Sequence, residues 1–311
     1  MARNLAWHDL WKLTAFKKQG IFLDSSLGLI YQPNLYANAL LSLIFPGSGF
    51  CTAVYSPPST PGKKLIGQIY FSSPGTSAQI VSLSPRDQLL HLGMSSVLSR
   101  LCKQVGEQGA VQVLAEIDRE SQAEEVFFQT GFRPYAEQTI WLFPKGLWPE
   151  NKSPAWIPLT RRHSEDVSYL YNHFTPPQIQ KVEPPPRMED IQGLIAWQRG
   201  ALAGYVLAEF GPRAVLVDVL IDPAVDNLRD HLIAVVRSLP YYHSRKVYFR
   251  VRGYQQRINT ALKELNAEPC REQIVVVKKL AVHYKAQQKI QMRSFEKQPD
   301  ITNPISNLEI D

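Results

Sequence analysis

Short runs of apolar residues recur along the first half of the chain and predict strands that alternate with helices. Between Leu89 and Val105 the apolar positions have helical spacing, which predicts a helix that ends at Gly106. A short helix is expected over 121–132. Apolar runs bounded by turn-forming residues predict strands over 50–56, 64–73, 77–84, 110–117 and 136–143. This order indicates a mixed α/β sheet flanked by helices.

The second half repeats this order of elements. The pattern predicts a hairpin over 193–210, strands over 214–223, 246–253 and 272–280, and helices over 226–238 and 256–267. Pro223 corresponds to Pro85, and Glu272-Gln273 corresponds to Glu137-Gln138, at nearly the same separation along the chain. Such a repeat predicts a duplicated domain. We expect domains over 1–147 and 148–285, followed by a polar, disordered tail over 286–311.

The composition is typical of a globular protein with two domains. Hydrophobic residues make up 44% and charged residues 20% of the 311 positions. No run approaches the ~18 apolar residues of a membrane span, and the N-terminus has no secretory signal. We therefore expect a cytoplasmic protein with no membrane span. The net charge of +6 favours anionic ligands but identifies none.

The spacing of cysteines and histidines predicts no metal site. Cys51, Cys102 and Cys270 are far apart and form no CxxC pair. The seven histidines form no HExxH or related motif. We therefore expect reduced thiols, no disulfide framework and no metal cofactor.

The stretch Pro85–Gly93 joins a predicted strand to a predicted helix and reads PRDQLLHLG. Together with the element order and Gly131-Phe132, it resembles the GNAT (GCN5-related N-acetyltransferase) superfamily, whose turn reads Gln/Arg-x-x-Gly-x-Gly/Ala. Gln88 and Gly93 match this turn, whereas His91 stands at the first glycine. The resemblance covers most of 13–142 and, more loosely, 156–282. It implies two tandem GNAT-like domains, each a twisted mixed sheet flanked by helices.

The resemblance also implies that acetyl-CoA is the co-substrate. Backbone N–H groups at the start of the long helix would hold its pyrophosphate. Pantetheine would lie between 80–83 and 111–117. The matching turn of the second copy has no glycine and carries Asp226 and Asp230, so the first copy is expected to hold the cofactor. The cofactor-binding residues implied are Leu83, Gln88, His91 and Gly93.

The usual chemistry of this superfamily needs a base for the amine, often a Glu, and commonly a Tyr as the acid for the thiolate. Glu116 and Asp118 are candidates for the base in the first copy, and Asp218 and Asp222 in the second. The simpler reading of all four is that they are solvated charges at strand ends. The positions expected for the tyrosine hold Phe127 and Leu262, so neither copy carries the usual acid.

Two functions follow from these observations. The first is an acyl-CoA-dependent N-acyltransferase that acetylates an amine of a small molecule or peptide, with the second copy shaping the amine site. The alternative is a degenerate GNAT-like binding or scaffolding protein. A basic and aromatic stretch over 243–257 could contact nucleic acid. It is read more simply as a half-buried strand with Val247, Phe249 and Val251 inward and Tyr248, Arg250 and Arg252 outward.

Overall fold

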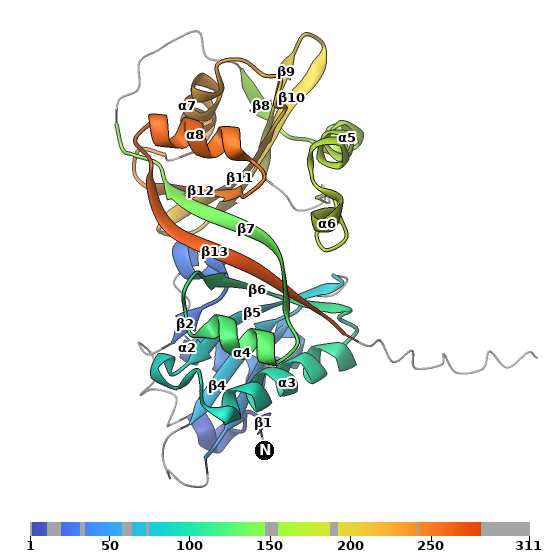
Figure 1. Cartoon of the computed structure of the whole chain (residues 1–311), viewed down its shortest axis with the longest axis vertical. Coiled ribbons are helices and arrows are strands. Elements are labelled where there is room, and N and C mark those ends of the chain that lie inside the picture. The colour runs from blue at the N-terminus through green and yellow to red at the C-terminus, as the bar shows by residue number, and fades with distance from the viewer. Residues whose placement is uncertain are drawn as a thin grey trace, which may run out of the picture.

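The computed structural model describes residues 2–10, 20–31, 35–57, 64–72, 75–146, 155–186, 192–240 and 242–280. Within these residues, thirteen strands form one mixed sheet that runs through both halves of the chain, as Figure 1 shows. The predicted α/β class, a twisted mixed sheet with flanking helices, is confirmed. The predicted tail over 286–311 lies outside the described residues.

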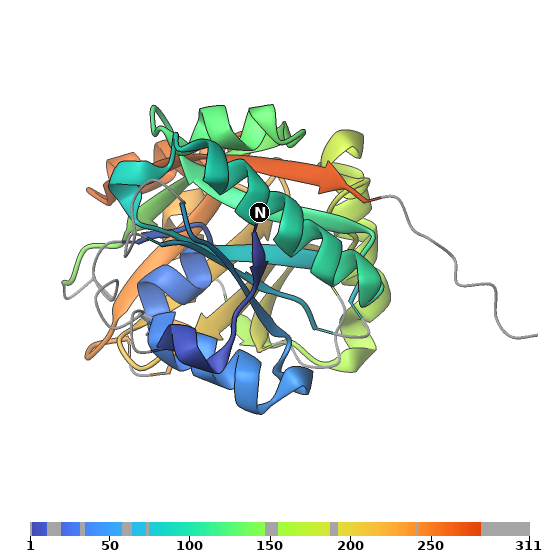
Figure 2. The same ribbon diagram turned by 90° about the horizontal axis from the view of Figure 1, so that it is seen from below.

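In the first half, helices cover both faces of the sheet, with α2 on one side and α3 and α4 on the other (Figure 2). Alternating strand residues explain this arrangement. Ala53 and Leu65 belong to the core that contains α3, whereas Val54 and Ile66 belong to the core with Ala39 of α2. The elements are β1 (Arg3–Asn4), β2 (Ile21–Phe22), α2 (Leu35–Ile44), β3 (Phe50–Tyr55), β4 (Leu65–Tyr70), β5 (Ser77–Ser84), α3 (Leu92–Glu107), β6 (Gln112–Asp118), α4 (Ala123–Gln129) and β7 (Arg133–Leu142).

The second half is built in the same way. Val219 and Ile221 pack in the core with α7 and α8, whereas Leu220 between them packs with α5. The predicted hairpin turns at Arg199 and Gly200, which both have positive φ, as a two-residue hairpin turn requires. The elements are β8 (Trp156–Pro158), α5 (Ser164–Phe174), α6 (Pro177–Gln180), β9 (Gly193–Gln198), β10 (Ala201–Phe210), β11 (Ala214–Ile221), α7 (Leu228–Ser238), β12 (Lys246–Arg252), α8 (Gln256–Glu264) and β13 (Glu268–Lys279).

The last strand of each half pairs with the other half. The order along the sheet is β6-β13-β7-β12, so β13 lies beside β6 and β7 lies beside β12. These two long strands run side by side between the halves in Figure 1. Gln138 and Gln273 are directly opposite in the register, and Nε2 of Gln138 donates to Oε1 of Gln273 at 2.8 Å. The sequence repeat equates these two glutamines, so they mark the approximate twofold axis between the halves.

Two expectations from the sequence need correction. The helix predicted from Leu89 begins at Leu92, because His91 adopts extended backbone angles and caps the helix. The face of β12 expected to point outward is covered, since Tyr248 is only 8% exposed and Arg250 is held in ion pairs. Tertiary packing on both faces of the sheet therefore overrides the simple reading of a half-buried strand.

Candidate functional site: the strand gaps and the polar junction

The gap between β5 and β6 is filled by the chain itself. These parallel strands pair only over Ser77–Gln79 and Gln112–Leu114, and then separate where pantetheine is expected. The short strand β2 lies in the gap and pairs antiparallel with β5, with Ile21 opposite Leu83. This segment therefore occupies the place expected for pantetheine.

Leu23, which follows β2, hydrogen bonds to both sides of the gap. Its N–H donates to the carbonyl of Val81 on β5 at 2.9 Å. Its carbonyl accepts from the N–H of Glu116 on β6 at 2.9 Å and from Nε2 of Gln79 at 2.7 Å. The Leu23 side chain is 2% exposed and belongs to the core of the first half. The residues present in this gap therefore do not fit a pantetheine arm, since both strand edges are already bonded.

The turn before α3 uses its own side chains to satisfy its backbone. Nδ1 of His91 accepts from the N–H of Gly93 at 2.9 Å, which makes His91 a helix cap. A Cβ on Gly93 would lie 2.4 Å from the ring of Tyr55, so packing explains this glycine without a phosphate. Gln88 is half-buried, and its backbone carbonyl accepts from the backbone N–H of His91. A contact of Leu83, Gln88, His91 or Gly93 with a cofactor stays a prediction.

The positions expected for the catalytic tyrosine are core positions in both halves. Phe127 is fully buried and packs edge-to-face on Phe132, with ring centroids 4.8 Å apart. Leu262 is also fully buried, in the core of the second half. Neither side chain has a proton to donate, and neither is accessible to solvent.

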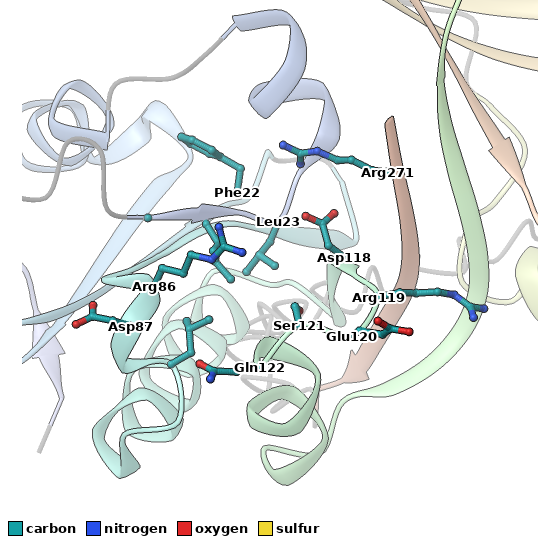
Figure 3. Close-up of a pocket in the computed structure, with 13 residues that line it drawn as sticks. Phe22, Leu23, Arg86, Asp87, Asp118, Arg119, Glu120, Ser121, Gln122 and Arg271 are labelled. Atoms are coloured by element: carbon teal, nitrogen blue, oxygen red, sulfur yellow. The ribbon is translucent and has the colours of Figure 1, made fainter. Parts of the chain in front are cut away.

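A pocket of about 900 Å³ opens beside the filled gap. Figure 3 shows that β2, the turn after β5 and the loop after β6 line it, together with Arg271 from β13 of the second half. Within the described residues, Arg86 and Arg271 form no ion pair with a carboxylate, whereas Arg119 pairs with Glu137. Asp118, one candidate base, is exposed here and accepts from Nε2 of Gln273 at 2.9 Å. The pocket therefore presents two arginines that an anion could engage.

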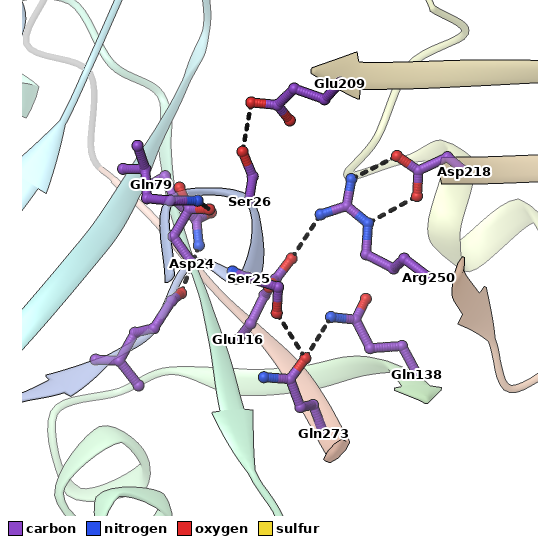
Figure 4. A network of polar contacts seen from close by, with 12 residues as sticks. Asp24, Ser25, Ser26, Gln79, Glu116, Gln138, Glu209, Asp218, Arg250 and Gln273 are labelled. Atoms are coloured by element: carbon purple, nitrogen blue, oxygen red, sulfur yellow. Dashed lines mark hydrogen bonds and ion pairs between the residues drawn. The ribbon is translucent and has the colours of Figure 1, made fainter. Parts of the chain in front are cut away.

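Glu116, the other candidate base, is part of a buried polar network between the halves. Figure 4 shows its carboxylate bonded to Arg250, which in turn holds Asp218. The distances are 2.9 Å from Nη1 of Arg250 to Glu116, and 2.7 Å and 2.6 Å from Nε and Nη2 to Asp218. The backbone N–H of Ser25 donates to the other oxygen of Glu116 at 2.7 Å. The tertiary structure thus joins two candidate bases through one arginine.

These partners oppose a role for Glu116 as a general base near pH 7. Burial alone would raise the pKa of Glu116, but the positive charge of Arg250 and the Ser25 hydrogen bonds lower it below the ordinary value. A carboxylate with a lowered pKa is a weak proton acceptor. Glu116 is therefore better suited to fixing Arg250 and the two halves than to taking a proton.

Asp24 is a titratable residue that the sequence reading missed. It follows the segment that fills the gap, and its Oδ1 accepts from the N–H of Leu27 at 3.1 Å. Burial and the nearby Glu116 carboxylate raise the pKa of Asp24 to about 7. No local motif marks this residue, since its environment is created by β6 and β12, which are distant in sequence.

The second half keeps a small pocket at the corresponding gap. β11 and β12 pair from Ala214 to Asp218 and then separate. The pocket of about 210 Å³ is lined by Val219 and Leu220 after the last pair, by charged residues of both strands, and by three tyrosines. Tyr205 is 5% exposed and its hydroxyl has no hydrogen-bond partner among the described residues. Asp222, the remaining candidate base, instead accepts from the backbone N–H of Ala224 at 2.7 Å.

Charged pairs fix the walls of this second pocket. Arg252 donates to Glu183 at 2.5 Å and also to Gln138, and the hydroxyl of Tyr135 donates to the same Glu183. Arg250 and Asp218 also line the pocket. The pocket therefore places a tyrosine hydroxyl next to both signs of charge.

The fold is similar to that of solved GNAT acetyltransferases. A GCN5-related N-acetyltransferase from Sphaerobacter thermophilus superimposes with a TM-score of 0.53 and 13% identity, over 90% of this chain and 95% of that chain. A tandem GNAT protein from the clavulanic acid biosynthesis pathway, solved without AcCoA, gives 0.50 and 14% identity, over 90% and 98%. No family model and no curated protein matches the sequence. The chain thus has the tandem GNAT fold, as the sequence resemblance predicted.

The described residues form neither a cluster of metal-ligating side chains nor a membrane-spanning helix. No group of three or more His, Cys, Asp or Glu side chains is placed to hold a metal ion in that part of the chain. No helix there is long and apolar enough to cross a membrane.

Proposed function

We propose that this chain is a small-molecule-binding protein built on the tandem GNAT fold, and that its first half does not transfer acyl groups from CoA. The observation that carries the proposal is the segment Ile21–Leu23, which is hydrogen bonded to both strands that border the first gap. In this proposal the small molecule binds in the pocket of about 210 Å³ at the gap of the second half. A cytoplasmic location and the domain boundaries 1–147 and 148–285 are part of the same proposal.

The second pocket suits a small molecule that carries both a positive and a negative group. Arg250 pairs with Asp218 and Arg252 pairs with Glu183, so both signs of charge line the pocket, and the hydroxyl of Tyr205 has no hydrogen-bond partner among the described residues. Free amino acids are the simplest probes with this chemistry.

Acyl-CoA-dependent N-acyl transfer is the second candidate function. It is favoured by Arg86 and Arg271, which line the first pocket, form no ion pair with a described carboxylate and could engage the phosphates of CoA. The fit of pantetheine is unfavourable while Leu23 fills the gap, so this candidate requires the segment to leave its place. Nucleic acid binding through β12 is disfavoured, because Arg250 and Arg252 are bonded inside the protein.

Thermal unfolding of the full chain with acetyl-CoA, and separately with free amino acids, tests the proposal. A ligand at 100 times its Kd adds about 2.7 kcal/mol of stability. We expect no stabilisation by acetyl-CoA, and stabilisation by at least one amino acid. The variant Tyr205→Phe keeps the ring and removes the hydroxyl, so it should weaken that effect.

The outcomes separate the two candidates. Stabilisation by acetyl-CoA that is lost in Arg86→Glu and Arg271→Glu, but kept in the control Arg213→Glu outside the pocket lining, supports N-acyl transfer and overturns the proposal. If no amino acid stabilises the chain, the binding role of the second pocket is wrong.

A further inference from the structure

The segment that fills the first gap continues into a short bridge to the second half. Residues 21–26, which we call the strap, begin as β2 beside β5 and end at Ser26, whose hydroxyl donates to Glu209 of β10 at 2.5 Å. Between these ends, the N–H of Ser25 donates to the carboxylate of Glu116 on β6 at 2.7 Å, as Figure 4 shows from close by. The strap therefore covers the gap between β5 and β6 and is bonded to both halves.

One side of the strap is open to solvent. Ile21, Phe22 and Leu23 line the first pocket of about 900 Å³, and Figure 3 labels the last two. Ile21 and Phe22 are partly exposed, whereas Leu23 is buried. β2 pairs with β5 over two residues only. A short, partly exposed segment of this kind opens locally at a lower free energy than the whole fold.

The strap carries a carboxylate that lacks a cation of its own. Asp24 is half-buried, accepts from the N–H of Leu27 at 3.1 Å and forms no ion pair with a described residue. The charged groups that act on it most strongly are Glu116 of β6, Glu209 of β10 and Arg250 of β12. Arg250 is the one cation among these three, and its guanidinium already holds two other carboxylates. An ionised Asp24 would therefore add a negative charge that these groups do not compensate.

We propose that the strap is a proton-gated cover of the first gap, which stays closed while Asp24 is protonated and opens more readily once Asp24 is ionised. Burial and the Glu116 carboxylate raise the pKa of Asp24 to about 7, whereas a displaced, solvated Asp has an ordinary pKa of about 3.9. The proton therefore stabilises the closed strap fully below about pH 4, and this stabilisation is lost as the pH rises to about 7. Opening frees the backbone edges of β5 and β6 that Leu23 occupies. The device is independent of the ligand proposed for the second pocket, because it needs only a proton.

Amide hydrogen exchange of the full chain, resolved by residue, tests this device. The N–H of Leu23 donates to the carbonyl of Val81 and the N–H of Ser25 donates to Glu116, so both amides exchange when the strap opens. After correction for the intrinsic pH dependence of exchange, we expect their protection to fall roughly fifty-fold from pH 5 to pH 7, and only about twofold more by pH 8. The N–H of Phe143, which donates to a carbonyl of β12, should show no such fall.

Asp24→Asn keeps an oxygen that can accept from Leu27 and removes the titration, so its protection should change less than about twofold over the same range. The control Asp226→Asn makes the same change in charge at an exposed position of the second half and should behave as wild type. The proposal is wrong if wild type shows no fall between pH 5 and pH 7, or if Asp24→Asn shows the same fall. It is also wrong if Phe143 loses protection as steeply as Leu23, because the whole fold then opens rather than the strap.

Discussion

Arg250 offers the sharpest test of how the two halves are held together. Its guanidinium bonds to Glu116 from the first half and to Asp218 from the second, and its side chain is only 19% exposed. Replacing it with methionine keeps much of the volume but removes the charge. The Glu116 carboxylate, whose side chain is 8% exposed, would then be buried without its cation.

The magnitude follows from the burial of the two carboxylates. Removing one partner of a buried ion pair costs about 3–5 kcal/mol, because the remaining charge is left without compensation. Asp218 adds little to this figure, since its side chain is 36% exposed and water can solvate it. We therefore expect Arg250→Met to lower the free energy of unfolding by about 3–5 kcal/mol, or the melting temperature by on the order of 10 °C.

Chemical denaturation of wild type, Arg250→Met, Glu116→Gln and the double variant forms a complete cycle. The double variant should be more stable than Arg250→Met, because it removes the uncompensated charge. The loss in Arg250→Met should also shrink from pH 7 to pH 5, as Glu116 becomes protonated. A loss below about 1 kcal/mol, or a double variant no more stable than the single one, would refute the reasoning.

Three other predictions follow from the same geometry. The pKa of Asp24 is raised to about 7, so between about pH 4.5 and 7 the folded protein keeps a proton on Asp24 that the unfolded chain has lost. The contribution of Asp24 to stability should therefore fall as the pH rises through this range, and Asp24→Asn should flatten this slope in thermal unfolding. Gly93→Ala should cost about 1–3 kcal/mol, since its Cβ meets the Tyr55 ring at 2.4 Å, whereas the control Gly47→Ala meets no atom within 4 Å and should be nearly neutral by denaturation. Fragments 1–147 and 148–311 should form a soluble complex when co-expressed and aggregate when expressed alone, because β7 pairs with β12 of the second half and β13 pairs with β6 of the first half. A fragment 1–147 that is monodisperse in size-exclusion chromatography and melts cooperatively would contradict the dependence of each half on the other's last strand.

The candidate site shows where prediction from sequence reached its limit. The start of α3 was located within three residues, because proline, apolar spacing and a polar cap are local signals. The role of His91 was not predictable, since its Nδ1 can serve the helix or a ligand and only the folded turn decides. The same holds for Glu116, whose partner Arg250 is 134 residues away in the chain.

The sequence by itself determined the elements from β3 to β7 and from β9 to β13, their order and the duplication. Periods of two and of about 3.6 residues report which face of a strand or helix is apolar, and Glu137-Gln138 and Glu272-Gln273 carry the repeat. Only the tertiary structure decided which strands pair, because period-two alternation says nothing about the partner of a strand edge. It therefore alone decided that β13 joins the first half and that Ile21–Leu23 fills the first gap, contacts made by backbone groups that every sequence carries.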